Sequence, residues 1–183
     1  MKHLALFISF ALALPALAQE KLGLRHLIDG RVTMLVPENF KPLEEKYRLL
    51  KYQGANPPTF VLSDETTRFN LAAELRSVPL QPEELPELAK AMPSQLSHAK
   101  FHAAGLRTLN GHEFAVFDMD TPAMDGTIRN IMAMTSLDGK LLVISYNCLI
   151  SKDAGCDVVG RKIIESIKLT QPEAAERHAT SVE

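Results

Sequence analysis

The chain has 183 residues, of which 46% are hydrophobic, and its formal net charge at pH 7 is −2. This length suits about one globular domain. Because acidic and basic residues are nearly balanced and interspersed, the composition gives no indication of a nucleic-acid partner or of binding to an anionic membrane surface.

The N-terminus has the three parts of a cleavable secretory signal. Lys2 supplies the positive charge, an apolar run extends from Leu4 to Leu17, and Ala16-Leu17-Ala18 forms an A-x-A cleavage site. The run is too short to cross a bilayer, and no cysteine follows the cleavage site to carry a lipid. We therefore predict a signal peptide over residues 1–18 and a mature, unanchored protein that starts at Gln19 in the periplasm or is secreted.

A hairpin and a short helix are expected next. Asp29-Gly30 is a dipeptide typical of tight turns, and it separates Leu27-Ile28 from residues 31–36, most of which are apolar. A helix is predicted from Pro42 to Lys51, because proline favours the first helical turn and apolar residues recur at helical spacing. Its inner side is expected to carry Leu43, Tyr47 and Leu50.

Two strands and a longer helix follow. Residues 59–62 and 69–75 are predicted strands on either side of a polar turn. The stretch from Pro82 to His98 is rich in Glu and Leu and favours a helix, which Pro93 is expected to kink or break. The inward side of this helix is predicted to carry Leu85, Leu88, Ala89, Met92 and Leu96.

Two further hairpins are indicated by their turn dipeptides. Asn110-Gly111 divides residues 105–118, and Asp138-Gly139 divides residues 128–146. Both dipeptides tolerate the positive φ angles of a type I′ turn. Residues 140–146 are apolar on both faces, so this strand is expected to lie in the centre of a sheet.

The chain closes with a helix and a polar tail. The helix is predicted from Asp153, a suitable N-cap residue, to Lys168, with Val159, Ile163 and Ile167 on its inner side. Residues 170–183 are expected to form a loose tail. Because strands and helices come in runs rather than in strict alternation, the sequence predicts an α+β fold with a largely antiparallel β-sheet and helices packed on it.

The two cysteines, Cys148 and Cys156, lie eight positions apart. In an oxidising compartment, a single pair of cysteines favours a disulfide over a metal site. We predict a structural disulfide that joins the end of one element to the start of the next. The short loop that it closes corresponds to about 2–3 kcal/mol of stabilisation.

Three short segments carry a resemblance to a known fold: residues 36–40 (VPENF), 109–112 (LNGH) and 163–169 (IIESIKL). With them the chain resembles the PsbP-like (Mog-type) α/β/α sandwich proteins, and among these the DcrB-like bacterial envelope proteins. The resemblance implies a single domain of this type over residues 19–169. Members of that superfamily are mostly non-enzymatic, so it also implies binding rather than catalysis, by analogy.

Four methionines are candidate binding residues. Met132 and Met134 alternate along a predicted strand and therefore share one face, and Met119 and Met124 precede them closely. Thioethers suit Cu(I), and methionine also fills irregular cores. We expect Met119, Met124, Met132 and Met134 to form an apolar binding surface, with copper binding as the alternative.

Three other patterns could form a catalytic or metal site, but each is more typical of ordinary surface residues. Ser97 and Lys100 match S-x-x-K, yet they fall at the end of a predicted helix, whereas the hydrolase mechanism needs the serine at a helix start. His98 and His102 have the spacing of a helical metal pair but lie where helix is expected to give way to strand. A calcium loop would draw on Asp118, Asp120 and Asp125, with the third acid late for the usual spacing.

The sequence therefore favours a non-catalytic periplasmic binding or accessory protein that recognises a protein or an apolar segment. Its most specific form is an immunity or effector-associated protein. We expect a protein partner in the cell envelope, no nucleic acid, no membrane anchor and no cofactor. The alternatives are a small envelope serine hydrolase that uses Ser97 and Lys100, and a copper- or calcium-handling protein.

Overall fold

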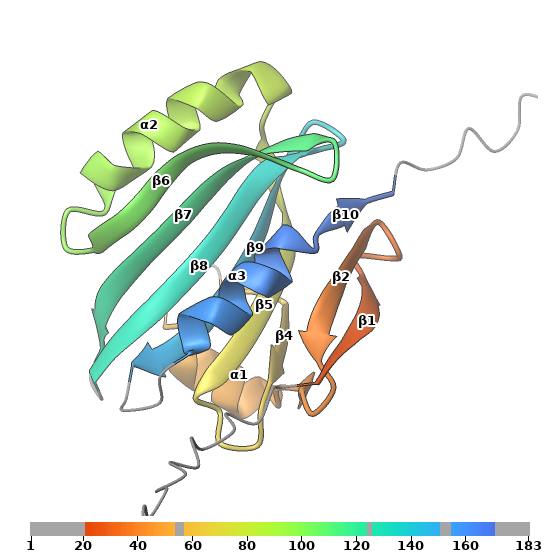
Figure 1. Cartoon of the computed structure of the whole chain (residues 1–183), viewed down its shortest axis with the longest axis vertical. Coiled ribbons are helices and arrows are strands. Elements are labelled where there is room, and N and C mark those ends of the chain that lie inside the picture. Colours follow the sequence, from red (N-terminus) through yellow and green to blue (C-terminus); the bar gives the residue numbers. More distant parts are fainter. Residues whose placement is uncertain (1–20, 54–56, 124–125, 151–154, 171–183) are drawn as a thin grey trace, which may run out of the picture.

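The computed structural model describes residues 21–53, 57–123, 126–150 and 155–170 (Figure 1). The predicted signal peptide lies outside these ranges, as do nearly all of the predicted tail, Met124, Asp125 and Asp153. Within the described ranges, no helix is both long and apolar enough to cross a membrane.

Two antiparallel sheets form the framework, and this confirms the predicted α+β class. The large sheet has seven strands in the order β3-β4-β5-β9-β8-β7-β6, and the small one has the order β1-β2-β10. The large sheet consists of β3 (Lys41–Pro42), β4 (Phe60–Ser63), β5 (Phe69–Pro79), β6 (Lys100–Leu109), β7 (His112–Ala123), β8 (Gly126–Leu137) and β9 (Lys140–Ile150). The small sheet consists of β1 (Leu22–Leu27), β2 (Val32–Pro37) and β10 (Lys168–Leu169).

The predicted hairpin turns are confirmed. Asn110-Gly111 and Asp138-Gly139 have positive φ at both residues, and each closes a two-residue loop between paired strands. The first hairpin has a four-residue loop instead, with Leu27 paired to Val32. The strand over residues 140–146 is central as predicted, because β9 lies between β5 and β8.

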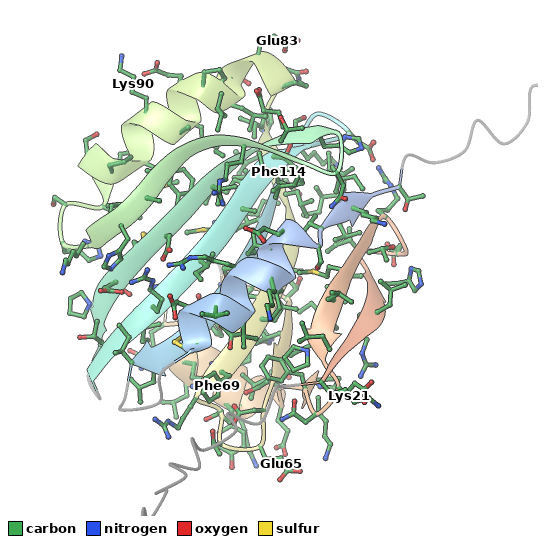
Figure 2. The ribbon with its side chains drawn as sticks, in the orientation of Figure 1. Lys21, Glu65, Phe69, Glu83, Lys90 and Phe114 are labelled. Atoms are coloured by element: carbon green, nitrogen blue, oxygen red, sulfur yellow. A yellow bond between two sulfur atoms is a disulfide. The ribbon has the colours of Figure 1, made fainter. Side chains whose placement is uncertain are left out.

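Each face of the large sheet buries its own apolar cluster. On one face, α3 (Cys156–Glu165) and the small sheet cover β5, β9 and β8, and Phe114 of β7 is enclosed in that core (Figure 2). On the other face, α2 (Leu85–Gln95) covers β6 and β7, with Ala89 packed toward Phe117. Glu83 and Lys90 point away from the sheet on this side (Figure 2).

The helix predicted from Pro42 to Lys51 begins later and faces outward. α1 runs over Glu45–Lys51, and none of these seven residues, all of which the structure describes, is buried. Tyr47 and Leu50 are exposed, so the predicted inner side is wrong. The physical reason is that Pro42 belongs to β3, paired with Leu62 of β4, and this pairing orients the chain before the helix starts.

The other two helices differ from expectation at their ends. A 3₁₀ turn at Pro82–Glu84 precedes α2, which continues to Gln95, two residues beyond Pro93. α3 starts after Gly155, whose φ of 116° is left-handed, so the helix is shorter at its N-terminus than predicted. It ends at Glu165, because the following residues turn into β10.

Candidate functional site

A groove of about 300 Å³ lies on the large sheet between α3 and β6, and we call it the β6 groove. Its floor is apolar, formed by Val116 of β7 and Ile131 of β8, both of which are buried. Residues 102–107 of β6 form one wall, and Arg161 of α3 stands on the other. The groove exists because α3 packs on β8, β9 and β2, which leaves β6 and part of β7 uncovered on this face (Figure 1).

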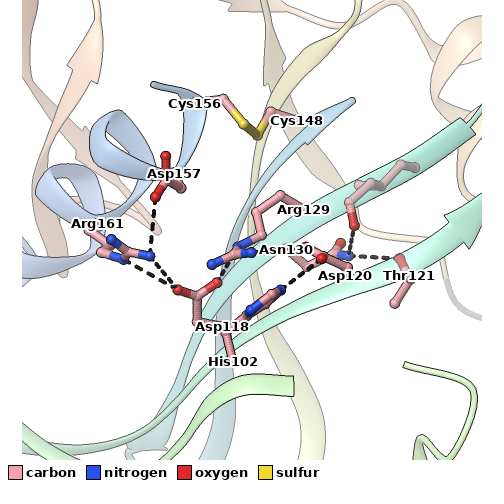
Figure 3. Close-up of polar contacts among 11 residues, drawn as sticks. His102, Asp118, Asp120, Thr121, Arg129, Asn130, Cys148, Cys156, Asp157 and Arg161 are labelled. Atoms are coloured by element: carbon pink, nitrogen blue, oxygen red, sulfur yellow. Dashed lines mark hydrogen bonds and ion pairs between the residues drawn. A yellow bond between two sulfur atoms is a disulfide. The ribbon is translucent and has the colours of Figure 1, made fainter. Parts of the chain in front are cut away.

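A chain of alternating charges crosses one end of the β6 groove (Figure 3). It connects His102, Asp120, Arg129, Asp118, Arg161 and Asp157 in that order, and these residues come from β6, β7, β8 and α3. We call it the charge chain. It links the edge of the sheet to the helix across three strands.

The centre of the charge chain is buried and its ends are open to solvent. The side chains of Asp118 and Arg129 are 9% and 11% exposed and form an ion pair. Arg161 donates to the other oxygen of Asp118 from Nε at 3.2 Å and from Nη2 at 3.0 Å. A buried carboxylate between two guanidinium groups is well compensated, whereas loss of one guanidinium group would leave its buried charge only partly compensated.

Strand register brings the acids and Arg129 together. Asp118 and Asp120 alternate along β7 and therefore share one face, and Arg129 lies directly opposite Asp120 in the β7–β8 pairing. Arg129 Nη1 donates to Asp120 Oδ1 at 3.0 Å. Arg161 also contacts Asp157 one helical turn earlier, with 3.2 Å between Nη2 and Oδ2.

A β-bulge places His102 at the outer end of the charge chain. Phe101 pairs with Met119 and Ala103 pairs with Asp118, so His102 is the extra residue on β6. Bulges commonly redirect a side chain. Here the His102 Nε2 atom lies 2.7 Å from Asp120 Oδ2.

Asp120 is held in its ionised form. Burial alone would raise the pKa of its carboxyl, but hydrogen bonds and charge attraction from His102 and Arg129 outweigh burial and lower that pKa below its usual value. The charge chain thus contains an ionised carboxylate at Asp120, between His102 and Arg129.

Three of the four methionines of the predicted binding surface lie within the described residues, and all three are buried or half-buried. Met119 and Met134 are buried, with exposures of 3% and 8%, and Met132 is half-buried. Met132 and Met134 pack with Phe117 in the core beneath α2, on the face opposite to the β6 groove. Met124 lies outside the described residues. Met132 and Met134 thus contribute to packing on the α2 side.

The residues of the hydrolase alternative do not share a helix. Ser97 is exposed in the turn that follows α2, and Lys100 is the first residue of β6. His98 lies in the same turn, whereas His102 belongs to the charge chain. The helical geometry that either pair would need is therefore absent from this part of the described chain.

The acids proposed for calcium are engaged by basic side chains. Asp118 binds Arg129 and Arg161, and Asp120 binds Arg129 and His102, while Asp125 lies outside the described residues. Among the residues that the structure describes, no group of three His, Cys, Asp or Glu side chains is placed to hold a metal ion.

The predicted disulfide between Cys148 and Cys156 is present (Figure 3). It joins the end of β9 to the first residue of α3, with 6.3 Å between the Cα atoms. The bond therefore fixes the N-terminal end of α3, the helix that carries Asp157 and Arg161 beside the β6 groove.

No family model and no curated protein matches this chain. Among solved structures, cyanobacterial PsbP (CyanoP) from Synechocystis sp. PCC 6803 is 13% identical, with 86% of this chain and 98% of that chain covered and a TM-score of 0.56. The Ran-binding protein Mog1p of Saccharomyces cerevisiae is 13% identical, with 82% and 96% covered and a TM-score of 0.54.

LpqN, involved in cell envelope biogenesis of Mycobacterium tuberculosis, is 14% identical, with 82% and 91% covered and a TM-score of 0.51. At these identities the likeness defines the fold and leaves the activity open. The nearer resemblance to DcrB-like proteins stays a prediction from the sequence. The chain therefore has the PsbP/Mog-type fold, an antiparallel sheet with helices on both faces.

Proposed function

We propose that this protein is a non-catalytic binding or accessory protein of the cell envelope that holds a segment of a partner protein in the β6 groove. The observation that carries the proposal is the groove itself, where a buried apolar floor meets exposed basic side chains. Apolar floors with a few convergent polar groups are typical of binding sites.

Both ends of the β6 groove offer a cation beside the apolar floor. Arg161 stands at the end with the charge chain, and its side chain is 44% exposed. The side chain of Arg107 on β6 is 57% exposed. Its Nη1 atom lies 3.9 Å from Oε1 of Glu165 at the C-terminal end of α3, which makes a weak surface ion pair. Each guanidinium group has five N–H donors, so both groups keep donors free for a ligand.

The charge chain supports binding rather than catalysis. Its carboxylates are paired with guanidinium groups, and its histidine is held by Asp120. A catalytic acid, base or nucleophile would have to reach a reacting group of a substrate. The side chains of the charge chain instead contact one another, and these contacts fix the position of α3 relative to β6. The charge chain thus shapes one end of the groove.

The envelope location rests on the N-terminal pattern and agrees with the disulfide. Residues 1–18 have the features of a secretory signal, and a cysteine pair of this kind persists in oxidising compartments. Of the similar structures, LpqN takes part in cell envelope biogenesis and Mog1p binds Ran. An immunity or effector-associated protein is the specific form of this function that we favour.

Site-specific photo-crosslinking tests the proposal. A photoreactive amino acid is placed at Ala103, exposed on the groove wall, in the full-length protein expressed in its own host. The matched control position is Leu24 of β1, which is 62% exposed and belongs to the small sheet. We expect a discrete protein adduct from Ala103 and none from Leu24. Equal yields at the two positions, or no adduct at Ala103, would contradict binding in the β6 groove.

A further inference from the structure

We propose that the partner binds by strand addition: an extended, acidic segment pairs with the outer edge of β6 and extends the large sheet by one strand. This inference rests on the proposed function and names how the β6 groove is used. Main-chain pairing at a free edge is a common mode of peptide recognition, with affinity from the backbone and specificity from side chains beside it.

β6 is a long edge strand. It ends the strand order of the large sheet, and in the described part of the chain no strand pairs with its outer side. It has ten residues, from Lys100 to Leu109, while β3 at the opposite edge has two. Natural sheets usually keep edge strands short or cover them, so a free edge of this length marks a site for pairing.

The hairpin defines which backbone groups face outward. Asn110-Gly111 is a two-residue turn, so Leu109 and His112 that flank it form a hydrogen-bonded pair. Because such pairs alternate along an antiparallel ladder, the N–H and C=O groups of Thr108, Leu106 and Ala104 point away from β7. These three residues present a regular row of donors and acceptors on the free edge.

The side chains of β6 leave this edge accessible. Ala103, Ala104 and Leu106 are exposed, and Gly105 between them has no Cβ. The irregular part of the strand is confined to the bulge at His102, near its start. A partner strand can therefore approach the second half of β6 closely.

The basic side chains on and beside β6 favour an acidic partner. β6 carries Lys100 and Arg107 and no acidic residue, and Arg161 lies across the groove. Lys100 has no ion pair with any residue that the structure describes. A second copy of this chain would bring an equally basic β6 against the first, so like charges oppose self-pairing.

The test combines the Ala103 crosslink with proline substitutions at outward-facing N–H groups. Leu106→Pro and Thr108→Pro each remove one outward donor and leave the β6–β7 ladder intact, because proline is tolerated where the N–H faces away from the neighbouring strand. The matched controls, Leu106→Ala and Thr108→Val, change the side chain and keep the N–H. Circular dichroism and urea unfolding establish that every variant is folded.

We expect each proline variant to lower the adduct yield by about tenfold, which is the effect of one lost hydrogen bond, and each control to stay within about twofold of wild type. If the proline variants crosslink as well as their controls, the partner lies in the groove without pairing to β6, and strand addition is refuted while the proposed function stands. Absence of an adduct in the wild type would overturn both.

The acidic character of the partner is tested in the same assay. Arg107→Glu is expected to reduce the adduct by about tenfold, whereas Lys90→Glu on α2, an equal change of charge on the other side of the sheet, leaves it unchanged. Mass spectrometry then identifies the crosslinked segment. A neutral or basic segment, a second copy of this chain, or a crosslink within the same chain would each refute the acidic partner.

Discussion

Gly160 of α3 lies directly against the ring of Tyr146 on β9. A Cβ atom at Gly160 would come within 2.5 Å of Tyr146 Cδ1 and 2.8 Å of Ile131 Cδ1. Both neighbours are buried, so neither can move without disturbing the core. This close approach holds α3 near β8 and β9 and thereby leaves the β6 groove open on its other side.

Gly160→Ala is expected to destabilise the protein by up to about 2 kcal/mol. Overpacking costs about 1–3 kcal/mol, which the better helix propensity of alanine offsets by about 1 kcal/mol. Urea unfolding measures the change. Gly23→Ala is the matched control, because a Cβ there meets only the flexible side chain of Glu38, and its midpoint should stay near that of wild type. Equal effects of the two substitutions would contradict the close packing.

Asp118→Asn is expected to cost about 2–4 kcal/mol in the free energy of unfolding. The substitution removes one of the two carboxylates that compensate Arg129, whose side chain is 11% exposed, and breaking one partner of a buried ion pair is strongly destabilising. Asp157→Asn is the control, since Asp157 is 38% exposed and pairs with Arg161 at the surface, where about 0.5 kcal/mol is expected. Denaturant unfolding of both variants checks the difference, and comparable losses would refute it.

Asp120 makes stability sensitive to acid. Its folded pKa lies below the unfolded value of about 3.9, because His102 and Arg129 together outweigh the effect of burial. The stabilisation is therefore complete above the unfolded pKa and is lost as the pH falls through the folded pKa. Between pH 6 and pH 3, the urea midpoint should fall less in Asp120→Asn than in wild type. Glu87→Gln, which removes an exposed carboxylate from α2, should retain the steeper wild-type decrease.

Removal of the disulfide is expected to lower stability by about 2–3 kcal/mol. The bond joins residues eight positions apart, and opening so short a loop releases a modest chain entropy in the unfolded state. The variant in which Cys148 and Cys156 are both alanine should unfold at lower urea than the oxidised wild type. A reducing thiol should shift the wild type by a similar amount and leave the variant unaffected, and a thiol effect on the variant would point to another cause.

The mature N-terminus should be Gln19. Mass spectrometry of the exported protein should detect the chain without residues 1–18. Ala18→Arg should block this processing, because the site requires a small residue there, while Leu17→Val at the unrestricted middle position should be processed normally. Export without cleavage in the wild type would contradict the prediction.

Much of the fold could be predicted because its signals are local. Asn110-Gly111 and Asp138-Gly139 need positive φ angles that few residues tolerate, and they therefore define the hairpins. The apolar pattern of residues 140–146 likewise identified the central strand. Predictions failed where burial depends on distant elements. Tyr47 and Leu50 have helical spacing, but β3–β4 pairing turns that side of α1 to solvent.

The candidate site was harder to predict, because its parts meet only through non-local contacts. In the sequence, His102, Asp118 and Asp120 suggest only metal sites or surface roles, and Arg129 and Arg161 do not stand out. Alternation along β7 could have placed the two acids on one face. The contribution of Arg129 depends on the β7–β8 register, and that of Arg161 depends on where α3 packs.

The hairpins and the α+β class could therefore be predicted from the sequence, because short-range sterics and hydrophobic periodicity encode them. The disulfide could be predicted because the chain has a single pair of cysteines. The tertiary structure decided the site. Ion pairs between β6, β7, β8 and α3 form only after strand register and helix placement are established. The close contact of Gly160 with Tyr146 then positions α3, and the free edge of β6 remains beside the groove.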